Sequence, residues 1–287
     1  MKPSNIFSIM DMALKARELN QVFNPLFTGE AGLGKSQIVQ QWAKKQKEKD
    51  PNFGFLDLRI AYMEAPDLIG FPEISKDESG DVRTRHRLPE FWPTQGRGLV
   101  LLEEPNRGTT GVMNCLMQLL TDRKVHNYTL PKGWIVAAAI NPDSAEYDVN
   151  SLDTALKNRF AIFDVEYDHN TFVSFMSSND WCSHIQYFVK SGTWAYKDAS
   201  ALSKDGIYIS PRTWSQLNAA HKAGATDDKQ LHRIIATAIL GKDIGNEFWK
   251  FVHDDAPVTS KDLISNRDKS INKLKEQSRP DAYQGDK

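Results

Sequence analysis

One ten-residue stretch, FTGEAGLGKS at 27–36, limits the folds open to this chain more than any other feature. Its Gly29, Gly34, Lys35 and Ser36 fit the pattern G-x-x-x-x-G-K-[ST], and the stretch follows an apolar run and opens a helical one. Glycines let backbone N–H groups curl around a β-phosphate, and the helix N-terminus adds positive potential there. The stretch therefore predicts a phosphate loop between a strand and a helix.

The chemistry of such a loop assigns a task to its last two residues. Lys35 is predicted to reach the β- and γ-phosphate oxygens of ATP, and the Ser36 hydroxyl to bind Mg²⁺. The alternative is a glycine-rich turn with a chance lysine. The flanking strand and helix favour the phosphate loop, and the predicted nucleotide-binding set is Gly29, Glu30, Ala31, Gly32, Leu33, Gly34, Lys35 and Ser36.

Two adjacent acids end the apolar run GLVLLEEPNR at 98–107. Parallel sheets bind ligands at the carboxyl ends of their strands, so both carboxylates are predicted to lie beside the phosphate loop. Glu103 takes the position of a Mg²⁺-supporting acid, with one methylene more than the usual aspartate. Glu104 is predicted to be the base that orients and polarises the attacking water. The alternative is an acidic strand end that only caps a helix.

The rest of the chain divides by pattern into three parts. Over 1–167, apolar runs alternate with helical patterns, which predicts an α/β fold with a parallel sheet between helices. Over 168–255 only helical patterns remain, which indicates a second, all-helical domain. The polar stretch 256–287 is predicted to be a mobile tail or a loosely attached helix. The expected strands are 25–29, 55–60, 98–104, 134–140 and 161–167.

The composition excludes several classes of protein. The chain of 287 residues is 40% apolar and 25% charged, with a net charge of −1, which is ordinary for a soluble globular protein and gives no global basic field. Cys115 and Cys182 lie far apart and match no metal-binding spacing, so a reducing compartment is the default. Without a signal peptide or an apolar run of membrane-spanning length, a cytoplasmic protein with no membrane partner is expected.

Taken in order, these motifs resemble those of the MoxR-type AAA+ ATPases over roughly residues 20–215. GEAGLGKS is similar to the Walker A loop, and LLEEPNR to the family's Walker B block, with Glu103 in place of Asp. EAPDLIG at 64–70 resembles the start of the helix-2 insert. Three further stretches match the family's later motifs: AAINP within 137–142, LDTALKNRF at 152–160, and SPRTW at 210–214.

The resemblance implies a P-loop AAA+ core followed by a small all-α lid. It implies Mg²⁺-dependent ATP hydrolysis by a hexameric ring that remodels or matures a protein complex, beside a von Willebrand factor A domain partner. It also implies Asn141 as sensor 1, Arg159 as an arginine finger next to Asn158 (where the family has Asp), and Arg212 as sensor 2.

Each of these three residues also has a structural interpretation, which the sequence leaves open. Asn141 could hold the attacking water against Glu104 or simply form an Asn-Pro turn. Arg159 could be a surface ion-pair partner. Arg212 lies in the first turn of a predicted helix, where a cation opposes the helix dipole; an anionic ligand would explain it, and so would a chance surface position.

A predicted hairpin keeps a second function open. In DVRTRHR at 81–87, the arginines Arg83, Arg85 and Arg87 alternate, so on a strand they share one face. This basic 83–87 arm suggests a nucleic-acid motor or loader, although the near-neutral net charge argues against strong non-specific binding. A solvated strand face explains it equally well. A third interpretation, a nucleotide-regulated binding module with little turnover, is less favoured because Glu104, Asn141, Arg159 and Arg212 are all present.

Overall fold

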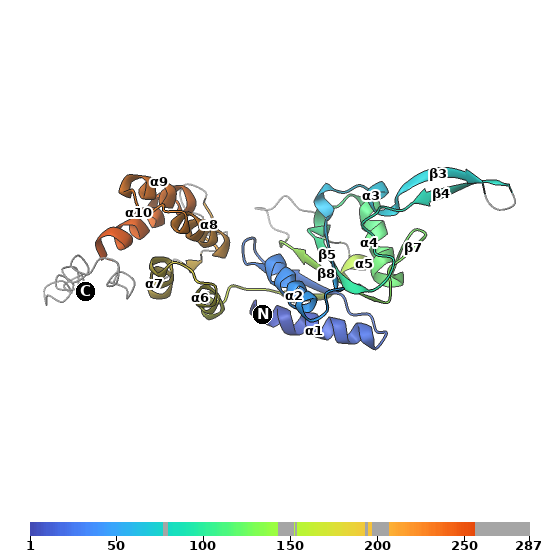
Figure 1. Ribbon diagram of the computed structural model, residues 1–287, viewed down its shortest axis with the longest axis horizontal. Coiled ribbons are helices and arrows are strands. Elements are labelled where there is room, and N and C mark those ends of the chain that lie inside the picture. The colour runs from blue at the N-terminus through green and yellow to red at the C-terminus, as the bar shows by residue number, and fades with distance from the viewer. Residues whose placement is uncertain (77–79, 143–151, 153, 193–194, 197–206, 256–287) are drawn as a thin grey trace. The chain divides into compact units, whose positions relative to one another are not determined.

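The computed structural model describes residues 1–76, 80–142, 152, 154–192, 195–196 and 207–255 (Figure 1). The chain forms two compact units, Met1–Thr171 and Phe172–Lys287. The stretch 256–287, predicted to be a tail, lies outside the described residues.

A five-stranded parallel sheet forms the centre of the first unit, with the strand order β2-β5-β8-β1-β9. All five predicted strands are present. The last is shorter than predicted: after β9 only the amide of Val165 continues the ladder, by donating to the carbonyl of Thr28 at 2.7 Å. The strands are β1 (Pro25–Thr28), β2 (Gly54–Arg59), β5 (Arg97–Glu103), β8 (Gly133–Ile140) and β9 (Ala161–Asp164).

Helices cover both faces of this sheet, as predicted, and the continuous apolar strands serve both sides. In β5, Leu99 and Leu101 pack in one core with α1 and α2, whereas Val100 and Leu102 pack in the other with α4. Side chains of a strand alternate between faces, so a strand buried on both sides must be apolar throughout. The helices are α1 (Asn5–Glu18), α2 (Lys35–Lys49), α3 (Ala65–Ile69), α4 (Thr110–Asp122) and α5 (Thr154–Lys157).

Two hairpins extend from this unit. The predicted arm consists of β3 (Phe71–Lys76) and β4 (Val82–Arg87), which pair antiparallel and project away from the sheet (Figure 1). A shorter hairpin consists of β6 (Lys124–Val125) and β7 (Tyr128–Thr129), which pair antiparallel. The ring of His126 in its turn lies 4.2 Å from the ring of His86 in β4.

The described part of the second unit is helical, as predicted. Its core contains the aromatic rings of Phe188, Trp214 and Phe248, with centroids 5.1–5.8 Å apart. The helices are α6 (His169–Ser178), α7 (Ser183–Ser191), α8 (Pro211–Lys222), α9 (Lys229–Leu240) and α10 (Lys242–Lys250), followed by a π-helical turn at Phe251–Asp255. Among the described residues, no helix combines the length and apolarity needed to cross a lipid bilayer.

Candidate active site

The phosphate loop connects β1 to α2 and depends on two glycines for its shape. Gly34 has φ +86°, a left-handed conformation that other residues rarely adopt, and it directly precedes the first turn of α2. Gly29 passes so close to β9 that a Cβ there would lie 2.3 Å from the carbonyl oxygen of Val165. Glycine is therefore required both where the loop begins and where it enters the helix.

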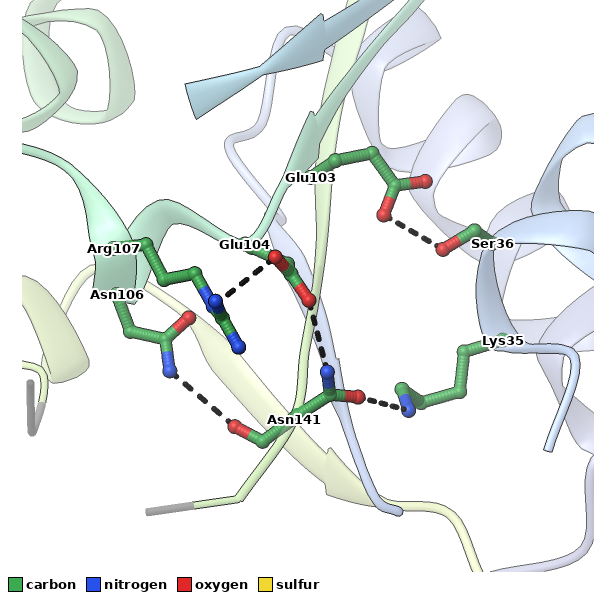
Figure 2. A network of polar contacts seen from close by, with 7 residues as sticks. All are labelled: Lys35, Ser36, Glu103, Glu104, Asn106, Arg107 and Asn141. Atoms are coloured by element: carbon green, nitrogen blue, oxygen red, sulfur yellow. Dashed lines mark hydrogen bonds and ion pairs between the residues drawn. The ribbon is translucent and has the colours of Figure 1, made fainter. Parts of the chain in front are cut away.

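Lys35 is a buried cation at the mouth of this loop. Its side chain is 6% exposed, and Nζ donates to the carbonyl oxygens of Gly29 at 2.5 Å and Glu30 at 2.8 Å. A third bond reaches Oδ1 of Asn141 at 3.3 Å (Figure 2). All three oxygens that accept from Lys35 are neutral. Replacing them with negatively charged phosphate oxygens would strengthen the hydrogen bonds of the ammonium, so Lys35 is suited to an anionic ligand.

Ser36 and Glu103 meet across the gap between α2 and β5. The Ser36 hydroxyl donates to Oε2 of Glu103 at 2.7 Å. Burial raises the pKa of the Glu103 carboxyl; the hydrogen bond from Ser36 opposes this rise, and the negative charge of Asp57 adds to it. A half-buried carboxylate beside a hydroxyl supplies the hard oxygen ligands that Mg²⁺ prefers, and a cation would offset the repulsion between Glu103 and Asp57. The pair therefore fits the predicted metal.

Asp57 is a carboxylate that the sequence analysis did not single out. It lies on β2, the strand next to β5, and burial is the main cause of its raised pKa. Gln40 of α2 donates to Oδ2 at 3.4 Å, and Oδ1 is buried without a hydrogen-bond partner. Nothing in the local sequence marks this residue, because its proximity to Glu103 arises only from the strand order.

Glu104 begins where β5 ends, and its backbone turns sharply. It has φ 49° and ψ 49°, while its amide still donates to the carbonyl of Ala139 in β8 at 2.9 Å. The carboxylate accepts a bond from Nδ2 of Asn141 at 2.9 Å (Figure 2). Asn141 follows β8 directly, so two neighbouring strands present the acid and the amide at the same edge of the sheet.

Asn106 and Arg107 complete this network. No role was predicted for either residue from the sequence. Asn106 is 3% exposed, and its Nδ2 donates to the backbone oxygen of Asn141 at 3.3 Å. Nε of Arg107 lies 3.1 Å from Oε2 of Glu104, which forms an ion pair. The signal available in the sequence was the LLEEPNR motif, in which both residues match the family it resembles.

Arg159 lies apart from this network. Ala161, two residues on, is paired with Pro25 at the start of β1, whereas the phosphate loop begins at the opposite end of that strand. The Arg159 side chain donates from Nε to Oγ1 of Thr121 at 2.6 Å and from Nη1 to the carbonyl of Ala155 at 2.5 Å. These contacts hold it at the far edge of the sheet from Lys35.

Arg212 belongs to the second unit. It is exposed in the first turn of α8, which begins with a capping box formed by Ser210 and Thr213. The sequence predicted that Arg212 lies in the first turn of a helix, and α8 has this residue there.

Together, the strand order, the phosphate loop after a central strand, and the polar ends of β5 and β8 define the class of this protein. It is an α/β protein whose parallel sheet carries a phosphate loop after a central strand, and a separate helical unit follows in the chain. No protein-family model matches the chain, and no curated protein matches it either.

Solved structures with a similar fold include the RuvB Holliday junction branch migration motor of Thermotoga maritima. That protein is 14% identical, with 91% of this chain and 76% of that chain covered, at a TM-score of 0.47. The structure of a point mutant of the same motor is also 14% identical, with 92% and 77% covered, at a TM-score of 0.49.

Proposed function

We propose that this chain is a Mg²⁺-dependent ATPase of the AAA+ class. The observation that carries the proposal is the meeting of three elements at one edge of the sheet. Lys35 of the phosphate loop, Asn141 after β8 and Glu104 after β5 form one continuous hydrogen-bonded chain. Ser36 and Glu103 lie beside them as an oxygen pair for the metal.

Each of these side chains has a task in hydrolysis. Lys35 exchanges neutral oxygens for the β- and γ-phosphate oxygens of ATP. Ser36 and Glu103 hold Mg²⁺, which supplies positive charge against the phosphates. Glu104 accepts a proton from water as the water oxygen bonds to the γ-phosphorus and the bond to the β–γ bridging oxygen breaks, releasing ADP. Asn141 keeps the Glu104 carboxylate in place.

The position of Arg159 supports a ring. Arg159 lies at the start of β1 and the phosphate loop at its end, and the four residues of β1 span about 13 Å. Arg159 therefore cannot contact a γ-phosphate bound by its own chain without breaking its present hydrogen bonds. An arginine finger supplied by a neighbouring subunit avoids this conflict. We therefore propose a homo-oligomer, as a hexameric ring, in which Arg159 completes the neighbour's site.

The role of Arg212 follows from its chemistry. A cation in the first turn of a helix is unfavourable in the field of the helix dipole, by about 0.3–1 kcal/mol at an exposed site. An anion bound there offsets that cost. We propose that Arg212 contacts the γ-phosphate as sensor 2.

The motif order supports the MoxR-type subgroup, and with it the remodelling or maturation of a protein complex beside a von Willebrand factor A domain partner. The β3–β4 arm favours a second candidate, a nucleic-acid motor or loader. Arg83, Arg85 and Arg87 share one face of β4, opposite Ser75, Glu73 and Phe71 of β3 in the register of the hairpin. A projecting ribbon with an arginine face could contact a phosphate backbone.

One assay distinguishes these functions. ATP turnover of the purified protein is measured alone, with single-stranded DNA, with duplex DNA and with RNA. Turnover that rises with a nucleic acid, and loses this response in Arg85→Glu, favours the motor on nucleic acid. Unstimulated turnover favours protein remodelling, and the Glu104→Gln variant loaded with ATP would then retain the client in a pulldown. Absence of turnover under all conditions rejects the ATPase.

A further inference from the structure

Glu104 is held from two sides. Its Oε1 accepts from Nδ2 of Asn141 at 2.9 Å, and its Oε2 pairs with Nε of Arg107 at 3.1 Å (Figure 2). Each carboxylate oxygen has two acceptor sites, so each oxygen can still accept one further hydrogen bond. Asn141 and Arg107 therefore set the direction of the carboxylate, and each of its oxygens keeps one acceptor site.

The backbone at this point is strained, and Arg107 lies on the segment that maintains the strain. Glu104 has a left-handed conformation, φ 49° and ψ 49°, although the following residue is Pro105, which favours an extended predecessor. Such a conformation costs about 1–3 kcal/mol and persists where its surroundings enforce it. Here the tight turn Pro105–Arg107 does so: the amide of Arg107 donates to the carbonyl of Glu104 at 2.9 Å.

The same turn is anchored to the neighbouring strand end. Asn106 is 3% exposed and donates to the backbone oxygen of Asn141 at 3.3 Å. The backbone from which the Arg107 side chain extends is therefore held in place by its neighbour. An isolated exposed ion pair would contribute about 0–1 kcal/mol to stability. This pair differs from an isolated one because its carboxylate is also bonded to Asn141. The expected consequence of the pair is orientation of the carboxylate rather than stability of the fold.

We propose that Arg107 is a positioning residue for the ATP hydrolysis proposed above, and that it acts by holding the Glu104 carboxylate in the direction in which it receives a proton from water. The proposal rests on that function. The negative charges of Asp57 and Glu104 both act on Glu103, so the carboxylate with which Arg107 pairs belongs to an acidic cluster at this end of the sheet. Loss of Arg107 is therefore expected to slow turnover and to leave nucleotide affinity unchanged.

A double-mutant cycle tests this assignment. Single-turnover hydrolysis is measured with labelled ATP for the wild type, Arg107→Gln, Glu104→Gln and the double variant, together with ATP affinity. Arg107→Gln is expected to hydrolyse ATP about tenfold more slowly with unchanged affinity, the size of a typical coupling between contacting residues. In the Glu104→Gln background the same change is expected to have almost no effect, because its target is gone. Arg107→Lys should recover part of the loss.

The chain offers a matched control on the same strand. Nη2 of Arg97, the first residue of β5, pairs with Oε1 of Glu18 at 3.1 Å, far from the site. Arg97→Gln breaks an exposed ion pair of equal length and should leave turnover unchanged. Full activity in Arg107→Gln, or an equal loss with and without Glu104, overturns the inference while the ATPase stands. A wild type that does not hydrolyse ATP rejects the proposed function itself.

Discussion

Asn141 bonds Lys35 and Glu104 at once: Oδ1 accepts from Nζ of the lysine at 3.3 Å, and Nδ2 donates to Oε1 of the glutamate at 2.9 Å. One amide thus links the cation expected to bind phosphate with the acid expected to activate water. A nucleotide that draws Lys35 away removes one of the two bonds that hold this amide. ATP binding and the orientation of the Glu104 carboxylate are therefore expected to be coupled through the Asn141 side chain.

Replacing Lys35 with Ala should abolish ATP binding, because the buried ammonium is the charge that phosphate oxygens would meet. Titration calorimetry measures this directly. Lys44→Ala is the control, since Lys44 is exposed on the same helix. ATP affinity equal to that of the wild type in Lys35→Ala would contradict the phosphate-loop assignment.

Glu104→Gln should bind ATP and hydrolyse it about 100-fold more slowly, the usual contribution of a general base. The glutamine keeps the shape of the side chain but cannot take up the proton. Glu103→Gln should instead raise the Mg²⁺ concentration needed for activity. If Glu103→Gln turned over more slowly than Glu104→Gln at saturating Mg²⁺, the two roles would be reversed.

Glu103→Asp restores the acid usual in the resembled family and should preserve activity. The shorter side chain would give up the direct hydrogen bond from Ser36, now 2.7 Å, and both oxygens would then be available to hold the metal. Half-saturation of turnover should therefore occur at a lower Mg²⁺ concentration. Loss of turnover at all Mg²⁺ concentrations would mean that the site requires the longer glutamate.

Arg159→Ala should still bind ATP and lose roughly 10³-fold in turnover, the low end for a missing arginine finger. Mixed with Glu104→Gln, it should regain activity. The mixed ring then contains interfaces that combine an intact acid with an intact arginine from the next subunit. Subunit exchange is verified by fluorescence transfer between labelled variants. An exchanging mixture that stays inactive would argue against a finger acting between subunits, and a fully active monomer would reject the ring.

The stability of the second unit should fall in acid. Burial and neighbouring histidines lower the pKa of His221 to about 3 and of His232 to about 4, from the ordinary value of 6.5. The two rings share a 2.9 Å hydrogen bond, and a 2.9 Å bond joins His232 to His253. Between pH 6.5 and 4 the unfolded chain takes up protons that the folded unit does not, so stabilisation is complete above pH 6.5 and decreases as the pH falls.

Thermal unfolding of the whole protein, followed by tryptophan fluorescence, measures this dependence. In His221→Phe the melting temperature should depend less on pH. This variant lacks one imidazole whose pKa differs between the folded and the unfolded state. His126→Asn is the control: His126 is exposed and has φ 54°, which asparagine tolerates. A melting temperature that stays constant from about pH 7 to about pH 5 would contradict the prediction.

The sequence by itself determined the elements of the site that are local in the chain. The phosphate loop can be read because its glycines, Lys35 and Ser36 are consecutive and are fixed by one turn between a strand and a helix. Glu103, Glu104 and Asn141 can be located because each follows an apolar run, and parallel strands end at a common edge. The same periodicity gave the five strands and most of the helices.

Only the tertiary structure decided what lies beside these residues. The negative charge of Asp57 acts on Glu103 because β2 pairs with β5, and this pairing is decided by the packing of the sheet rather than by any local pattern. The left-handed backbone of Glu104 and its ion pair with Arg107 depend on a turn anchored to β8, since residues three apart can equally well point away from each other. Spacing along the chain specifies which side chains lie at the edge of the sheet. The strand order and the backbone conformation of Glu104 determine which of these side chains form hydrogen bonds and ion pairs with each other.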